Sequence, residues 1–151
     1  MAREQYDKNE SSLKQSSGRM DLTVYGAILH NDAVLLVRHA SGDKADHGHW
    51  IMPAGKVGTG ENLKEALIRE IREETGLGVE VDGKLAEHID PHTGDRLVSF
   101  LCAPTTSRVE MGSELAEARW FKMHEITELE RIHPGLKRFL VGIVEEEERE
   151  H

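Results

Sequence analysis

Three glutamates, Glu70, Glu73 and Glu74, follow one another closely in the stretch REIREE. The three- and four-residue spacings between them are same-face spacings of a helix, so all three side chains would lie on one side. Carboxylates are hard oxygen ligands that suit Mg²⁺ or Mn²⁺, and Mg²⁺ is usually held by one or two of them together with substrate phosphates and water. The spacing therefore indicates a candidate site for a divalent cation.

Repulsion among these carboxylates must be offset by something. Like charges four residues apart destabilise a helix by about 0.2–0.5 kcal/mol per pair. Arg69 and Arg72 can offset part of this cost, and a divalent cation would offset it more fully. The alternative is a solvated helix face, which is what most charged runs of this length form. The six residues alone do not decide between these interpretations.

The helix that must position the carboxylates is expected over residues 62–75. Asn62 is a suitable N-cap, and Gly76 stands where a left-handed glycine commonly ends a helix. Leu67 and Ile71 belong to an apolar stripe beside the acidic face. Because an amphipathic helix buries such a stripe, the glutamates are expected at the border of the core, where they can be partly desolvated.

A wider pattern surrounds the acidic run and reads GKVGTGENLKEALIREIREETGL over residues 55–77. A glycine is followed by five residues, Glu61, seven residues, Arg-Glu-Ile, one residue, Glu-Glu, one residue and Gly-Leu. This order matches the Nudix box at every defined position, and the chain therefore resembles a Nudix hydrolase. The family usually has glycine before the first box glycine, where this chain has Ala54. That departure indicates that position 54 needs neither a positive φ nor an especially close approach.

The resemblance implies an α/β fold, the Nudix α/β/α sandwich with a mixed β-sheet, in which the box forms a loop–helix–loop that holds the site. It also implies Mg²⁺ or Mn²⁺ as the cofactor. The implied metal ligands are the carboxylates of Glu70, Glu73 and Glu74 and the carbonyl oxygen of Gly55. An ion pair between Glu61 and Arg69 would fix the loop against the helix and support these ligands.

The implied activity is metal-dependent hydrolysis of a diphosphate bond in a nucleoside diphosphate linked to another group, such as a nucleoside triphosphate or an ADP-ribose-like substrate. Glu70, Glu73, Glu74 and Glu114 are the candidate catalytic residues. The proton acceptor for the attacking water is either Glu70 or an acid of the polar stretch 108–118, which contains Glu114 and Glu117. Glu114 is favoured, because metal coordination lowers the basicity of a carboxylate and such loops can close over a substrate.

Arg38 is the candidate substrate-binding residue, since it ends an expected strand and could reach a phosphate. A surface ion pair would explain it equally well. Some family members that act on ADP-ribose carry a proline about fifteen residues past the box, and Pro91 lies close to that place. A proline in a turn needs no function to explain it.

Two other functions come from different classes. A Nudix-fold binding or regulatory module would keep the fold and lose the acids, but every box acid is present here. An RNA 5'-end pyrophosphohydrolase would need basic patches, and a formal net charge of −9 argues against a broad nucleic-acid footprint. The expected partner is therefore a small-molecule nucleotide, with nucleic acid disfavoured and a homodimer left open.

The length of 151 residues favours one domain, with residues 1–20 as a polar N-terminal extension and residues 21–151 as a single Nudix domain. No apolar run reaches the roughly 20 residues that cross a membrane. Cys102 is the only cysteine, which excludes an internal disulfide and suits a reducing cytoplasm. It lies in an apolar run, so we expect a buried side chain and not a nucleophile.

The remaining elements follow from apolar runs and turn signals. Asn31-Asp32 is a turn dipeptide suited to a tight hairpin. His47 and His49 lie in an expected loop, where histidines are mostly solvated. The expected strands are 22–30, 33–39, 79–89, 96–103 and a short one at 119–121, and the expected further helices are 125–130 and 134–148.

Overall fold

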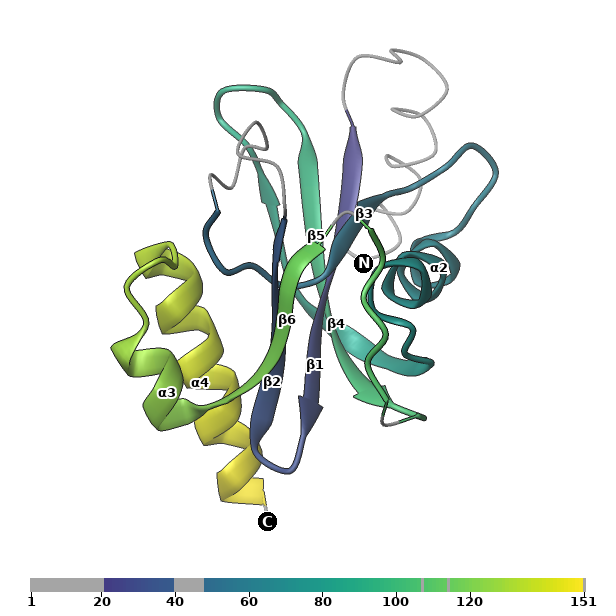
Figure 1. Ribbon diagram of the computed structural model, residues 1–151. Helices are drawn as coiled ribbons and strands as arrows, with labels where there is room; N and C mark the ends of the chain where they lie inside the picture. The colour runs from purple at the N-terminus through teal and green to yellow at the C-terminus, as the bar shows by residue number, and fades with distance from the viewer. Residues whose placement is uncertain (1–20, 40–47, 107, 114, 151) are drawn as a thin grey trace.

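The computed structural model describes residues 21–39, 48–106, 108–113 and 115–150 (Figure 1). A mixed six-stranded sheet has the order β4-β5-β1-β2-β6, and β3 pairs with β1 beside this path. The strands are β1 (Leu22–His30), β2 (Ala33–His39), β3 (Ala54–Lys56), β4 (Val79–Ile89), β5 (Arg96–Pro104) and β6 (Leu115–Lys122). The helices are α2 (Leu63–Thr75), α3 (Met123–Glu128) and α4 (Pro134–Glu150). The expected N-terminal extension and His47 lie outside the described residues.

The first hairpin forms where the sequence predicts it. Asn31 and Asp32 have φ of 52° and 62°, the left-handed values that a type I′ turn needs. The two strands then separate, and the chain before the box enters between them. Ile51 accepts a hydrogen bond from the Val37 N–H at 2.8 Å. The carbonyl of Pro53 accepts one from the Gly26 N–H at 2.9 Å. This insertion brings the start of the box to the middle of the sheet.

The helices cover both faces of the sheet, as Figure 1 shows, with α2 on one side and α3 and α4 on the other. On the first side, Leu67 and Ile71 of α2 belong to a buried cluster with Val24 of β1 and Val98 of β5. On the other side, Leu140 of α4 belongs to a second cluster, whose members include Phe121 and Ile126. The arrangement is the expected α/β/α sandwich with a mixed sheet.

One expected element differs clearly from the observed one. Residues 119–121 were expected as a short strand after a polar loop, but β6 already begins at Leu115. Its backbone pairs with β2 from His39↔Leu115 to Ala33↔Lys122, so sheet pairing overrides the polar composition of this stretch. Glu117 therefore lies on a strand and not on a loop. α3 also begins two residues earlier than expected, at Met123.

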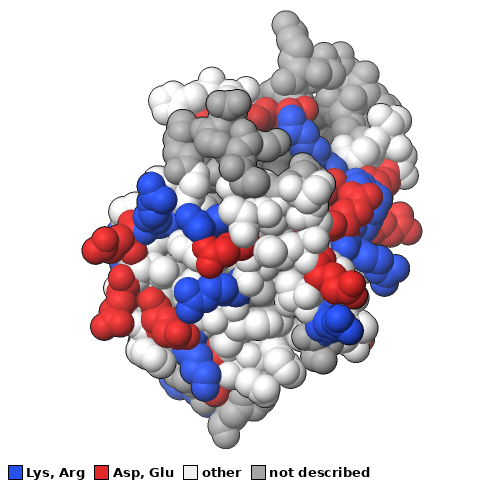
Figure 2. All heavy atoms as spheres, viewed as in Figure 1, with Lys and Arg blue, Asp and Glu red and all other residues white. Residues whose placement is uncertain are grey.

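The expected burial of Cys102 is confirmed by the packing. Cys102 is 1% exposed, as its apolar surroundings predict, and burial raises the pKa of its thiol to about 12. Among the described residues, no helix is long and apolar enough to cross a bilayer. On the face drawn in Figure 2, charged side chains of both signs are interspersed, both on the side where α2 lies in Figure 1 and on the side where α3 and α4 lie.

Candidate active site

The helix that carries the acidic residues has the boundaries that the sequence predicts. The side chain of Asn62 accepts a hydrogen bond from the Glu65 N–H at 2.8 Å, which caps the first turn of α2. At the other end, Gly76 has a φ of 76° and donates its N–H to the carbonyl of Arg72 at 2.9 Å. These two caps set where the helix begins and ends.

Glu70 lies against the backbone at the start of the box. A Cβ placed on Gly55 would come within 2.1 Å of the Glu70 Cδ atom and 2.6 Å of its Oε2 atom. A side chain at position 55 would displace the Glu70 carboxyl group, so the glycine is what lets Glu70 lie against this backbone. The carboxyl group of Glu70 thus lies against β3 at Gly55, whose carbonyl oxygen is a candidate ligand.

Glu74 is the buried member of the acidic group, with its side chain 8% exposed. Its Oε1 atom accepts a hydrogen bond from the Ala54 N–H at 3.3 Å, and its Oε2 atom lies 3.5 Å from Nε2 of His39. Burial raises the pKa of Glu74 to about 7, although the Ala54 N–H and His39 act in the opposite direction. A cation beside this carboxyl group would favour its ionised form.

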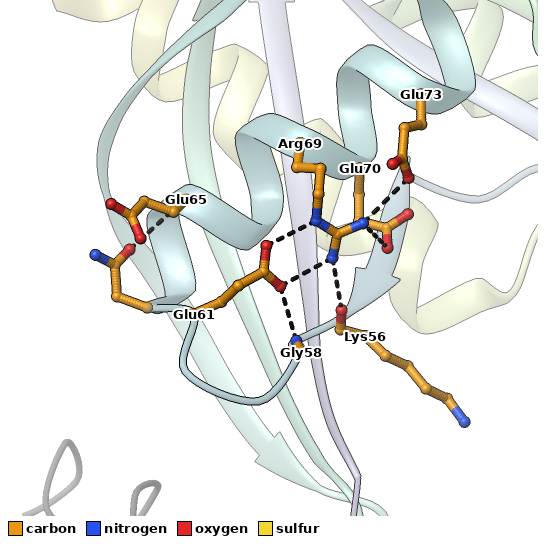
Figure 3. A network of polar contacts seen from close by, with 8 residues as sticks. Lys56, Gly58, Glu61, Glu65, Arg69, Glu70 and Glu73 are labelled. Carbon is orange, nitrogen blue, oxygen red and sulfur yellow. Dashed lines mark hydrogen bonds and ion pairs between the residues drawn. The ribbon is translucent and has the colours of Figure 1, made fainter.

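Arg69 connects the loop and the helix through its guanidinium group (Figure 3). It donates to Glu61 from Nε at 2.7 Å and from Nη2 at 2.9 Å, and Glu61 also accepts the Gly58 N–H at 2.8 Å. The expected ion pair between loop and helix is therefore present. Nη1 of Arg69 also contacts Glu70 at 3.0 Å and Glu73 at 3.1 Å, which offsets part of the repulsion between these carboxylates.

The donors suit a hard divalent cation, because carboxylates and a backbone carbonyl supply only oxygen. Within the described part of the chain, however, no group of three or more His, Cys, Asp or Glu side chains is arranged to hold a metal ion. Glu70 and Glu73 face Arg69, while Glu74 faces Ala54 and His39. A cation at Glu70 and Glu73 would compete with Arg69 for their carboxylate oxygens, while the pair of Arg69 with Glu61 can remain.

Arg38 and Glu117, two other expected site residues, contact each other. Arg38 at the end of β2 forms an ion pair with Glu117 on β6, directly across the two strands, and its guanidinium lies 5.1 Å from the centre of the Trp50 ring. Glu117 is thus paired with Arg38 and lies on a strand. A mobile base was expected on a loop. Glu114 lies outside the described residues. Pro91 lies in the connection between β4 and β5.

His39 and Ala54 are the contacts of Glu74 that sequence reasoning missed. His39 lies 35 positions before Glu74 and Ala54 lies 20 before it, so no local spacing links them to the box. The contact of Ala54 is made by its backbone N–H, which every residue type except proline possesses. Only the insertion of the chain between β1 and β2 brings these groups together.

The profile of one family, described as the NUDIX domain, matches residues 20–141. This chain belongs to the Nudix family. The described site agrees with that membership, since the box acids, the box arginine and the first box glycine all meet at the junction of loop and helix.

Similar proteins of known sequence include two with named activities. The human 8-oxo-dGDP phosphatase NUDT18 is 37% identical over 95 residues, which are 60% of this chain and 28% of the relative. The ADP-ribose pyrophosphatase of Methanocaldococcus jannaschii is 28% identical over 112 residues, which are 72% of this chain and 65% of the relative. Among other curated Nudix relatives, the matched share of the relative is 25%, 37% and 67%.

Solved Nudix structures have the same fold. A crystal structure of an ADP-ribose pyrophosphatase from Streptococcus suis superimposes with a TM-score of 0.68 at 25% identity. The superposition covers 87% of this chain and 94% of that chain. The helices and strands of this Nudix chain are therefore arranged as in proteins of the family.

Proposed function

We propose that this Nudix chain hydrolyses a diphosphate bond in a nucleoside diphosphate linked to another group, with Mg²⁺ or Mn²⁺ as cofactor. The observation that carries the proposal is the convergence of two box carboxylates on adjacent residues of β3. Glu70 lies against Gly55, and Glu74 accepts the N–H of Ala54. A binding module has no need to bring two carboxyl groups, one of them buried, to the same piece of backbone.

When bound, a divalent cation would supply charge neutralisation for the diphosphate and would lower the pKa of a water toward neutral pH. The residues that would hold it are Glu70, Glu73, Glu74 and the carbonyl of Gly55. Arg69 and Glu61 keep the loop in place against α2 by their paired hydrogen bonds. Phosphoryl transfer depends mainly on positioning and charge, so this rigid junction contributes directly to the rate.

Two further residues complete the proposed site. Glu114 is proposed as the acceptor of the proton from the attacking water, because a carboxylate that does not ligate the metal keeps more of its basicity. Arg38 is proposed to bind a substrate phosphate. Its ion pair with Glu117 and its contact with Trp50 hold the guanidinium in place before a phosphate competes for it.

The substrate class follows from the chemistry shared by the named relatives. One relative is named as a phosphatase of 8-oxo-dGDP and another as a pyrophosphatase of ADP-ribose. Both substrates are nucleoside diphosphates, one free and one linked to ribose. We therefore propose a nucleoside diphosphate derivative as the substrate.

A substrate panel tests this function. The purified chain is assayed with Mg²⁺, with Mn²⁺ and with EDTA against ADP-ribose, nucleoside diphosphates and triphosphates including 8-oxo-dGDP, dinucleoside polyphosphates, nucleotide sugars and RNA with a 5'-triphosphate. We expect metal-dependent release of phosphate or a mononucleotide from a nucleotide of the panel, with loss of most of kcat in Glu73→Gln. Binding of a nucleotide without any release would favour a binding module. Release from RNA alone would favour the RNA 5'-end activity.

A further inference from the structure

The segment between β5 and β6 crosses the C-terminal end of α2, and residues 108–112 of this segment are called the strap. Figure 1 shows the strap running beside the end of this helix. The N–H of Glu110 donates to the carbonyl of Thr75 at 2.7 Å, and the N–H of Gly112 donates to the carbonyl of Glu74 at 2.8 Å. The last carbonyls of a helix have no partner within the helix, so the strap supplies two of the missing donors.

The strap approaches the helix most closely at Gly112. A Cβ placed there would lie 2.8 Å from the carbonyl oxygen of Glu73 and 3.6 Å from that of Glu74. Real Cβ atoms essentially never come within 3.0 Å of another heavy atom, and the neighbour is backbone, which cannot rotate away. The φ of Gly112 is not in the left-handed region, so the glycine is required by space and not by conformation.

The same contact closes a ring of interactions around Glu74. Gly112 holds the backbone carbonyl of Glu74, and the N–H of Leu115 donates to the carbonyl of Gly112 at 3.3 Å. Leu115 begins β6 and pairs there with His39. His39 in turn lies 3.5 Å from the carboxyl group of Glu74. Glu74 is thus fixed through its backbone from one side and through its side chain from the other.

We infer that Gly112 is a positioning residue for the box carboxylates. By docking against the last turn of α2, the strap sets where Glu73 and Glu74 lie relative to the backbone of Gly55. The part of the inference that concerns metal affinity rests on the proposed function. The part that concerns the position of the helix end stands on the contacts alone.

The test compares Gly112→Ala with Gly142→Ala in the full chain. Gly142 is a matched control, because a Cβ built there meets nothing within 4 Å. The dissociation constant of Mn²⁺ is measured by following the electron paramagnetic resonance signal of the free ion. Backbone hydrogen exchange is measured over residues 70–77. Removing a supporting contact of a metal ligand typically costs about 10- to 100-fold in metal affinity. We expect that loss, with faster exchange, in Gly112→Ala and wild-type values of both in Gly142→Ala.

Unchanged exchange over residues 70–77 in a folded Gly112→Ala variant would overturn the inference. Unchanged Mn²⁺ affinity beside faster exchange would overturn its metal part. A wild-type chain that binds no Mn²⁺ would contradict the proposed function, while the exchange result would still decide whether the strap fixes the helix end.

If Gly112→Ala does not fold, Val109→Ala decides the same question without a steric clash. Val109 packs against the core cluster beneath α2, so truncating it loosens the strap. We expect faster exchange over residues 70–77 and a smaller loss of Mn²⁺ affinity, of several-fold. A folded Val109→Ala variant with wild-type exchange would contradict the inference.

Discussion

Glu70, Glu73 and Glu74 differ in their exposure to solvent, and this difference separates their chemistry. The side chain of Glu73 is 60% exposed, that of Glu70 is 20% exposed and that of Glu74 is 8% exposed. Exposed carboxylates ionise in water without penalty, whereas burial disfavours the charged form. The carboxyl group of Glu74 therefore tends either to bind a proton and stay neutral or to be ionised beside a cation.

The stability of the metal-free protein should report this property of Glu74. Burial raises the pKa of Glu74 in the folded protein to about 7, whereas the ordinary pKa of a glutamate side chain is 4.5. Between these values the folded state binds more protons than the unfolded state, so the free energy of unfolding falls as the pH rises from about 4.5 to about 7. Glu74→Gln, which is isosteric with protonated Glu74, should lack this fall. In EDTA, thermal unfolding should show the two proteins alike near pH 5 and the variant more stable at pH 8.

The control for this experiment is Glu145→Gln on the exposed side of α4, which should follow the wild-type pH dependence. Parallel curves for the wild type and Glu74→Gln across this range would show that Glu74 is not held protonated in the metal-free protein.

The proton acceptor can be identified by comparing Glu114→Gln, Glu117→Gln and Glu70→Gln at saturating metal. General-base catalysis contributes about 10²–10⁴-fold, so Glu114→Gln should lose at least about 100-fold in kcat. Glu117→Gln should keep kcat and change KM, because it releases Arg38 from its ion pair. Near-normal kcat in Glu114→Gln beside an inactive Glu70→Gln would identify Glu70 of α2 as the proton acceptor.

At the scale of the elements, prediction from sequence worked where the signal was local. The ends of α2 follow from Asn62 and Gly76, and the first hairpin from Asn31-Asp32, because each turn or cap needs particular residue types. The start of β6 could not be predicted in this way. Its residues pair with a strand about 80 positions earlier, and this pairing leaves no local pattern in the sequence.

The same limit applies to the candidate site. The Glu61–Arg69 pair was predictable because both residues belong to one motif, and it is present. The contacts of Glu74 with His39 and Ala54, and the docking of the strap, arise from tertiary packing. Sequence reasoning therefore located the acids but not the groups that hold them.

The junction of loop and helix depends on Arg69 more than on any single carboxylate. Its side chain is 38% exposed, and exposed ion pairs contribute only about 0.2–1 kcal/mol each. We expect Arg69→Gln to lower the melting temperature by about 2–4 °C, the shift that about 1 kcal/mol produces in a domain of this size. We expect kcat to fall by about 10- to 100-fold, because a support of the proposed metal ligands is removed.

Thermal unfolding and steady-state kinetics of Arg69→Gln and Lys64→Gln measure both effects. Lys64 is an exposed residue of the same helix and should change neither quantity. A variant Arg69→Gln with normal kcat and a lowered melting temperature would limit this arginine to a structural role.

At the scale of the whole molecule, the sheet separates two hydrophobic clusters that support different helices. The cluster beneath α2 supports the helix that carries the acids, and the cluster beneath α3 and α4 lies on the opposite face. We expect both clusters to contribute to one cooperative folding transition, as is usual for a domain of about this size. Only the first lies directly beneath the candidate site, so stability and catalysis should respond differently to changes in the two.

Ile71→Ala and Leu140→Ala test this separation with matched truncations. Both side chains are aliphatic and 0% exposed, and each truncation should lower the free energy of unfolding by about 2–5 kcal/mol in urea denaturation. Ile71 packs tightly against β1, where a Cβ on Gly26 would come within 2.9 Å of its Cδ1 atom. Loss of that contact lets α2 shift, and a displacement of about 1 Å can cost about 10²-fold in rate. At a temperature where both variants are folded, kcat should therefore fall strongly in Ile71→Ala and little in Leu140→Ala. Equal losses of kcat in the two variants would show that the site depends on the whole core and not on the cluster beneath α2.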